Sequence, residues 1–141
     1  MAKHVLKDAV VTVNSVDLTD HVSSVTVETT TPEVEVTSMG DDFQSVIRGI
    51  PSAQITVSFF QDYAAAEVDA TLWPLSTTDT PFPVAVKVTS AAISATNPEY
   101  QMASALLMNY SPISGDIGSA NTTEVTFINA GQLGIVRDVA P

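Results

Sequence analysis

Apolar and polar residues alternate along several stretches of the chain, most clearly at residues 54–60. There Ile55, Val57 and Phe59 are separated from one another by single polar residues. A period of two is typical of a β-strand that buries one face and exposes the other. The same alternation predicts further strands, at residues 22–30, 32–38, 84–88 and 122–128, and a last one at residues 134–139.

One helix is predicted, at residues 63–73. Asp62 precedes it and is a candidate N-cap, because its carboxylate can accept hydrogen bonds from free backbone N–H groups. The helical spacing places three apolar residues on one stripe: Ala65, Val68 and Leu72. Pro74 disfavours a helical conformation at Trp73, so the helix is expected to end there. We expect this helix to cover a sheet formed by most of the remaining chain.

Residues 100–110 are compatible with either a helix or a strand. Alanine, leucine and methionine favour a helix intrinsically. The stretch is short and bounded by Pro98 and Pro112, however, which favours a strand. We therefore predict a strand, with one face formed by Met102, Leu106, Met108 and Tyr110.

Two other segments are predicted from their turn residues and their lack of periodicity. Asn14-Ser15 separates short apolar stretches at 9–13 and 16–18, and this predicts a tight hairpin. Residues 1–8 have no clear pattern and are expected to form an N-terminal arm that a partner orders. Residues 37–51 are predicted to form a long loop, and loops of this length usually have a function.

The composition supports one mainly β domain over residues 1–141. The chain is rich in valine and threonine, and only 15% of its residues are charged. β-Branched side chains pack well on a pleated surface. The length of 141 residues is sufficient for a single core.

The charge of the chain excludes an ordinary nucleic-acid-binding surface. Sixteen acidic residues against five basic ones give a formal net charge of −11, whereas binding to phosphates requires clustered lysine and arginine. There is no cysteine for disulfide or thiolate chemistry. The first residues lack the apolar segment of a signal peptide, and no run is long enough for a membrane helix, so we expect synthesis in a cytoplasm and no membrane partner.

Catalytic and metal-binding patterns are weak, and we predict no catalytic residue, no cofactor and no metal site. Asp17, Asp20 and His21 are close in sequence but lack a recognised ligand spacing, and His21 is interpreted as a surface or edge residue. Asp41-Asp42 lacks the spacing of an EF-hand. Trp73 is interpreted as a core residue or an anchor at the helix end.

Several segments together resemble the major tail tube proteins of long-tailed, non-contractile bacteriophages. They are residues 11–28 (VTVNSVDLTDHVSSVTVE), 59–63 (FFQDY), 68–75 (VDATLWPL) and 95–100 (ATNPEY). Their order and spacing extend the resemblance over about residues 10–127. Asn14-Ser15 departs from the expected Asn-Gly, and the carboxyl end is short.

The resemblance implies a β-sandwich or partly closed barrel with one flanking helix. It also implies hexameric rings that stack around the tape measure protein and form a virion tail tube, assembled in the host cytoplasm. Tail terminator and distal tail proteins would bind the tube ends, and DNA would pass through the lumen without specific binding. The alternatives are a tail terminator or head–tail connector of the same fold, an adhesive surface β-domain and, least favoured, an enzyme.

Within such a tube we predict two sets of functional residues. Alternation places Glu28, Glu33 and Glu35 opposite four valines that we expect to face the core: Val25, Val27, Val34 and Val36. We predict that these acids line the lumen, the alternative being ordinary solvated acids on an outer surface. The predicted loop supplies the candidate ring-to-ring contact: Gly40, Asp41, Asp42, Phe43 and Arg48.

Overall fold

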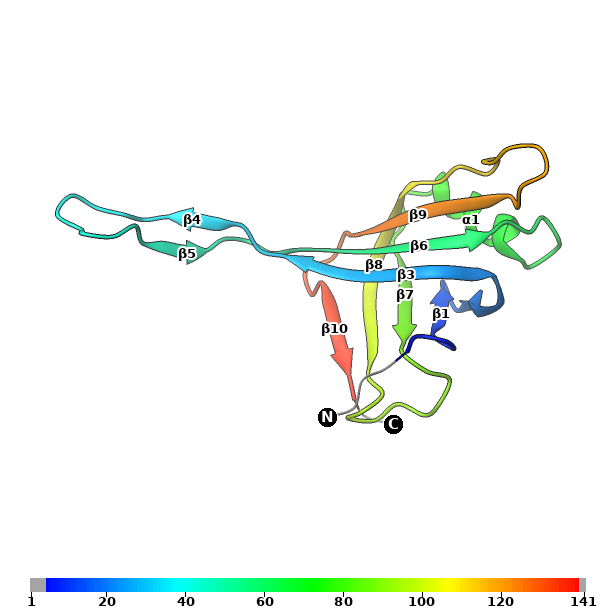
Figure 1. Cartoon of the computed structure of the whole chain (residues 1–141), viewed down its shortest axis with the longest axis horizontal. Coiled ribbons are helices and arrows are strands. Elements are labelled where there is room, and N and C mark those ends of the chain that lie inside the picture. Colours follow the sequence, from blue (N-terminus) through cyan, green and yellow to red (C-terminus); the bar gives the residue numbers. More distant parts are fainter. Residues whose placement is uncertain (1–4, 140–141) are drawn as a thin grey trace.

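A strongly bent antiparallel sheet and a long projecting hairpin dominate the computed structural model, which describes residues 5–139 (Figure 1). The first four residues of the expected N-terminal arm lie outside the described residues. The strands are β1 (Val10–Val13), β2 (Val16–Asp17), β3 (Val22–Thr30), β4 (Glu33–Glu35), β5 (Val46–Arg48), β6 (Ser52–Phe60), β7 (Phe82–Lys87), β8 (Glu99–Asn109), β9 (Thr122–Asn129) and β10 (Ile135–Asp138). The helices are α1 (Val68–Ser76) and the short 3-10 helix η1 (Thr19–His21).

The main sheet has eight strands in the order β2-β1-β7-β8-β9-β6-β3, with β10 also paired to β8. Strands β3, β6 and β9 run across the view of Figure 1, whereas β1, β7, β8 and β10 run down it. Both groups contribute buried side chains to one core, together with α1. The predicted fold class, a mainly β sandwich or partly closed barrel with one flanking helix, is therefore confirmed. None of the helices in the described part of the chain is long and apolar enough to span a membrane.

The alternating pattern identified the core-facing residues of the central strands correctly. Ile55, Val57 and Phe59 on β6 are fully buried, as are Val125 and Phe127 on β9. The predicted Asn14-Ser15 turn is also present and joins β1 to β2. Both of its residues have positive φ, 49° and 68°, as expected for the turn type that matches the twist of a two-residue hairpin.

The predicted boundaries of the helix are wrong. The helix begins at Val68 rather than residue 63, because Ala66 adopts a left-handed conformation with φ 64° that interrupts any helix before it. Asp62 is not the N-cap. Its Oδ1 instead accepts a hydrogen bond from the Ala64 N–H at 2.9 Å, in the turn that precedes the helix.

The helix also continues past Pro74 and ends at Ser76. Its core-facing side chains are Val68, Leu72 and Leu75. The last turn is stabilised by side chains, because the Ser76 hydroxyl donates to the Trp73 carbonyl at 2.7 Å and the Thr77 hydroxyl to that of Pro74 at 3.2 Å. Trp73 itself is 52% exposed, so it is not a core residue, whereas its role as an anchor at the helix end stays a prediction.

Residues 100–110 form a strand, as predicted, but not with a single face. Between the pairs Val84↔Met102 and Phe82↔Ala105, two residues of β8 lie opposite Pro83 alone. This bulge is located where proline lacks the N–H that a regular ladder needs. It reverses the alternation, so that Met102 and Ala105 are both buried while Met108 is 62% exposed.

The predicted long loop at residues 37–51 is wrong, because β5 lies within it and pairs with β4. The two strands form a ribbon that extends far from the sheet (Figure 1). Val34 and Val36 are each 45% exposed, so the expectation that they face the core is also wrong. Val25 and Val27 do pack against the core, as predicted.

Candidate assembly surfaces

The projecting hairpin, residues 32–49, has two chemically different faces. Its register pairs Glu33 with Arg48, Val34 with Ile47, and Glu35 with Val46. Because side chains alternate along each strand, Val34 and Ile47 share one face, and Glu33 and Arg48 lie on the other. At the base, the Gly49 N–H donates to the Pro32 carbonyl at 2.7 Å. A Cβ at Gly49 would lie 3.0 Å from the Pro32 ring, so glycine allows the two segments at the base of the hairpin to approach closely.

The hairpin exposes more apolar surface than an isolated ribbon in water would be expected to carry. The exposed apolar side chains are Val34, Val36, Met39, Phe43, Val46 and Ile47, with exposed fractions from 45% to 103%. Large exposed apolar surfaces of this kind are typical of protein–protein contacts. This part of the chain is therefore a candidate contact with another subunit.

The predicted ring-to-ring residues all lie on this hairpin. Gly40 is at the tip with φ 92°, and Phe43 is 86% exposed. Asp41 orders the tip, since its Oδ2 accepts hydrogen bonds from the backbone N–H and the hydroxyl of Ser38 at 2.8 and 3.1 Å. Arg48 donates to the Thr31 hydroxyl at 2.9 Å. Asp42 is exposed beside Asp41.

A second candidate surface is the outward side of β3, β6 and β9, which we call the acid–hydroxyl face. Its cross-strand rows are Ser24, Ser58 and Glu124; Thr26, Thr56 and Thr126; and Glu28, Gln54 and Ile128. The three strands contain no lysine or arginine. The face therefore combines short hydroxyl side chains with uncompensated negative charge.

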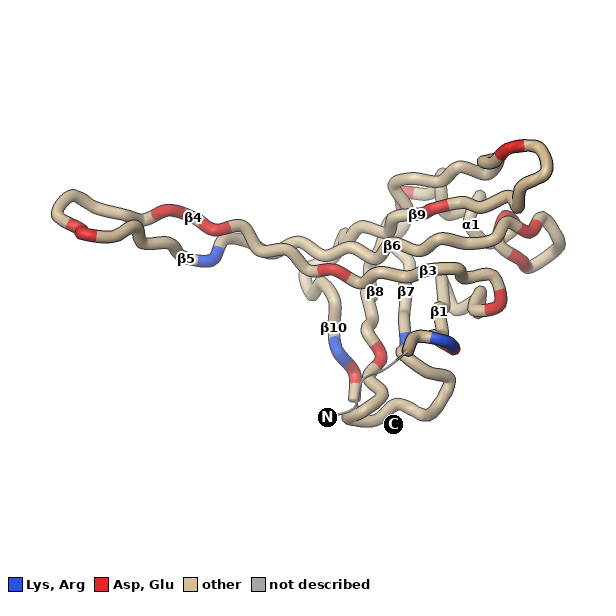
Figure 2. The backbone as a smooth tube through the Cα atoms, viewed as in Figure 1, with Lys and Arg blue, Asp and Glu red and all other residues tan. Residues whose placement is uncertain are grey.

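The three predicted lumen acids are not all located on this face. Glu28 belongs to it, whereas Glu33 and Glu35 lie on β4 in the projecting hairpin (Figure 2). Glu124 belongs to the face and was not among the predicted residues. The alternation of residues 122–128 was sufficient to place Glu124 on the other face of the strand from Val125. The pairing of β9 with β6, and of β6 with β3, was needed to place Glu124 on the same face as Glu28.

The ends of the main sheet are a third candidate surface. Strand β3 ends the strand order on one side and β2 ends it on the other. An edge strand presents unpaired backbone groups to which a strand of another chain can add. The 9-residue β3 is the longer of these two edges.

The structure does not bring together the acids and the histidine that were considered as a metal site because they are close in sequence. Asp17 accepts hydrogen bonds from the backbone N–H and the hydroxyl of Thr19. His21 instead faces Asp62 and Glu67. Its side chain is only 18% exposed, so it is not an ordinary surface residue, but it directly precedes β3 at the edge of the sheet, as the alternative interpretation expected.

Tyr110 links the β8 end to the helix. Its hydroxyl donates to Asp69 Oδ1 at 2.7 Å and accepts from Gln61 Nε2 at 3.0 Å. Burial, and then the hydrogen bond to Asp69, raise the pKa of Tyr110 well above its ordinary value. Both effects disfavour the phenolate, because burial removes solvation from the charge and the carboxylate repels it.

Comparison with proteins of known sequence gives no match, either to a family model or to a curated protein. Comparison with solved structures does give matches. A chain of the native gene transfer agent virion aligns with a TM-score of 0.74 and 14% identity, covering 95% of this chain and 99% of that one. The fold is tail-tube-like.

Other solved assemblies contain the same fold. A chain of the gene transfer agent tail, refined with helical C6 symmetry, aligns with a TM-score of 0.65 and 13% identity over 86% of this chain and 83% of that one. A chain of the sheath/tube terminator of an extracellular contractile injection system aligns with a TM-score of 0.74 and 11% identity, covering 98% of both chains. The fold thus occurs in both kinds of particle and does not distinguish between them.

Proposed function

We propose that the protein is a structural subunit of a virion tail tube. Six copies form a ring, and the rings stack around a tape measure protein into a tube that conducts the genome to the host cell. Terminator and distal tail proteins bind the two ends of this tube. The proposal is supported by the fold likeness to a chain of a tail refined with C6 symmetry.

The projecting hairpin is the observation that carries the proposal. In one copy of the chain, Val34, Phe43 and Ile47 are 45%, 86% and 55% exposed. Burial of apolar surface stabilises an interface by roughly 25 cal/mol per Å². The hairpin extends away from the body, and we assign its contact to a neighbouring ring. The tip residues Gly40, Asp41 and Asp42 would order that contact, and Arg48 would lie near its base.

The acid–hydroxyl face is the proposed lumen surface. Glu28 and Glu124 from six copies would surround the channel with negative charge, which repels DNA phosphates and lets the genome slide. The small hydroxyl side chains between them provide polarity without cationic groups that would bind DNA. Glu33 and Glu35 would add to the lumen charge where the hairpin of one ring lies along the next.

Ring closure is assigned to the edges of the main sheet. In a closed ring, the backbone donors and acceptors of the edge strands are covered by neighbouring subunits. They are then not available for uncontrolled aggregation. The β3 edge is continuous with the base of the hairpin through residues 31–32, so lateral and axial contacts are formed by adjacent parts of one chain.

Negative-stain microscopy of the purified protein tests the proposal. We expect rings or tubes of uniform width. Replacing residues 37–44 by Asn-Gly places the turn directly after the hydrogen-bonded pair of Val36 and Ser45, so it retains the β4–β5 pairs and should give rings that do not stack. A strict monomer at high protein concentration under all salt conditions would contradict the proposal and favour an adhesive domain.

A matched pair of point variants tests the hairpin itself. Phe43 and Ile117 are both apolar loop residues, 86% and 107% exposed, and only Phe43 is on the hairpin. We expect Phe43→Ser to impair stacking and Ile117→Ser to leave it unchanged. Equal behaviour of the two variants would show that the hairpin tip does not form the contact.

A tail terminator is the second candidate function. The alignment to a chain of the sheath/tube terminator has the same TM-score, 0.74, as that to the virion chain. A terminator forms one ring and then stops. Single rings that never stack, at any concentration of the unmodified protein, would favour this function.

A further inference from the structure

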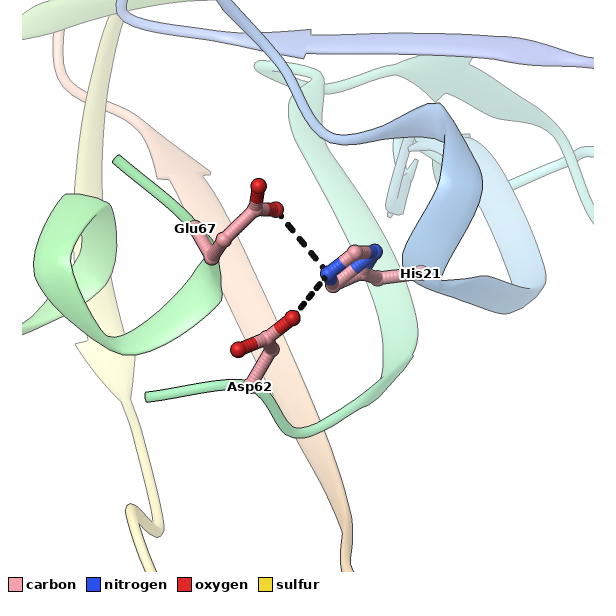
Figure 3. A group of neighbouring side chains, drawn as sticks. All are labelled: His21, Asp62 and Glu67. Carbon is pink, nitrogen blue, oxygen red and sulfur yellow. Dashed lines mark hydrogen bonds and ion pairs between the residues drawn. The ribbon is translucent and has the colours of Figure 1, made fainter. Parts of the chain in front are cut away.

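His21, Asp62 and Glu67 form a cluster where two distant segments meet. His21 ends η1, Asp62 follows β6, and Glu67 immediately precedes α1. His21 Nε2 lies 2.9 Å from Asp62 Oδ2 and 3.0 Å from Glu67 Oε2. Figure 3 shows both carboxylates directed at the same ring nitrogen. The three potential ligand atoms all lie within 4.8 Å of one another.

Backbone hydrogen bonds fix the Asp62 carboxylate and the main chain on either side of the cluster. Asp62 Oδ1 accepts the Ala64 N–H at 2.9 Å, which leaves Oδ2 directed towards the histidine. The Asp62 carbonyl accepts the Asp69 N–H at 3.0 Å, and the Glu67 carbonyl accepts the Thr71 N–H at 3.0 Å. The bond to Asp62 Oδ1 is an outer contact of the kind that orients a metal ligand before the ion binds.

This arrangement is better suited to a divalent cation than to a single proton. One N–H at Nε2 would have to serve two carboxylates, and without that proton the nitrogen lone pair would face two negative groups. A cation between the three atoms interacts favourably with all of them. We propose that His21, Asp62 and Glu67 bind a divalent cation of the Zn²⁺ type, for which imidazole and carboxylate are ordinary ligands.

The two distances from the histidine require only a small adjustment, and the two carboxylate oxygens, which lie within 4.8 Å of each other, must come to the same separation. Tetrahedral zinc with ligands at about 2.0–2.1 Å needs ligand atoms roughly 3.3 Å apart. The two edges at 2.9 and 3.0 Å must therefore open by a few tenths of an ångström. Asp62 and Glu67 are 39% and 38% exposed at their side chains, so an ion and a water molecule as its fourth ligand can reach them from solvent.

The consequence of binding is structural. An ion held by these groups links η1, and through it the start of β3, to the segment that leads into α1. An ion that binds the folded chain and not the unfolded chain stabilises the folded state by mass action. This inference is independent of the tail-tube proposal, because it concerns a site within one subunit.

Calorimetric titration of the EDTA-treated, dialysed full chain with ZnCl₂ tests the site. We expect saturable binding of one ion per chain and a rise in melting temperature with zinc. His21→Gln keeps an amide donor but removes the imidazole, and it should weaken binding by at least about 10-fold. The X-ray absorption spectrum of the zinc-bound protein should show one imidazole, which His21→Gln removes.

Two control variants separate this site from unspecific binding. Asp20→Asn removes a neighbouring carboxylate outside the cluster, and His4→Gln removes the other histidine of the chain, which lies outside the described residues. Both should bind zinc as the unmodified protein does. No saturable binding, an unchanged affinity in His21→Gln, or an equal loss in either control would overturn the proposal and leave the cluster as an ion pair only.

Discussion

Val34 on β4 lies directly opposite Ile47 on β5, and the two side chains are 45% and 55% exposed. They form the centre of the apolar face of the projecting hairpin. Neither residue belongs to the core cluster. The pair therefore provides a way to change assembly without changing the folded body of the subunit.

We expect the double variant Val34→Ser, Ile47→Ser to form rings but to stack poorly. The free energy of unfolding of the subunit should change by no more than about 0.5 kcal/mol, because the substitutions lie outside the core. Chemical denaturation and microscopy measure the two effects separately. Met108→Ser is the control, since Met108 is 62% exposed on β8, away from the hairpin. Normal tubes from the double variant would contradict the role of this face.

The proposed lumen charge predicts a change in DNA release. Particles with Glu28→Lys and Glu124→Lys should eject DNA slowly or retain it, because the substitutions replace repulsion of phosphates by attraction. The effect should weaken with added salt, since the screening length is about 10 Å at 0.1 M. Ejection rates can be followed by the fluorescence of a DNA-binding dye.

The matched control for the lumen carries the same charge change elsewhere. Asp79→Lys with Asp116→Lys alters two exposed loop acids and should leave ejection unchanged. If both pairs slow ejection equally, net charge rather than the acid–hydroxyl face is responsible. A tube structure with Glu28 and Glu124 on the outer surface would also exclude the lumen assignment.

Replacing Thr123 by valine is expected to stabilise the subunit. Thr123 is 2% exposed, and its hydroxyl has no hydrogen-bond partner within residues 5–139. A buried hydroxyl without a partner has a desolvation cost, so Thr123→Val should raise the free energy of unfolding by about 1 kcal/mol. Urea denaturation measures the change. A destabilised variant would indicate that the hydroxyl has a partner in solution.

Tyr110 predicts a loss of stability in alkaline solution. Its pKa is raised in the folded state above the ordinary value of 10.0, so above that pH the unfolded chain loses the phenol proton while the folded chain keeps it. The stabilisation is complete below pH about 10 and decreases as the pH rises further. Urea denaturation between pH about 8 and about 11 should show this decrease.

The variant Tyr110→Phe removes the titrating group and the hydrogen bond to Asp69. At neutral pH it should lower the free energy of unfolding by about 1–2 kcal/mol. Its stability should then depend less on pH in the alkaline range than that of the unmodified protein. An identical alkaline decrease in both proteins would show that other groups cause it.

The sequence predicted the parts of the fold in which one face is buried against a core. Val57 and Phe127 belong to strands whose alternation is imposed by that core, and so the strands could be identified locally. The hairpin could not be identified in this way, because β5 is exposed on both faces and has no such alternation. Its pairing with β4 depends on the neighbouring strand rather than on burial.

Other features depended on contacts between distant residues. The helix start is determined by the left-handed Ala66, a conformation for which alanine gives no local signal. The partners of His21 are 41 and 46 positions away in the sequence, and only the fold brings them together. The reversed faces of β8 likewise arise from Pro83 on the adjacent strand.

The hairpin is mechanically continuous with the body of the subunit. Strand β3 leads into β4 through residues 31–32, and β5 returns to β6 through residues 49–51. A pull on the tip along the strand direction is therefore transmitted to the β6–β9 ladder as shear, which loads its hydrogen bonds together rather than one after another. A tube built from such subunits would resist stretching through its sheets, while bending would be concentrated in the ribbons between the rings.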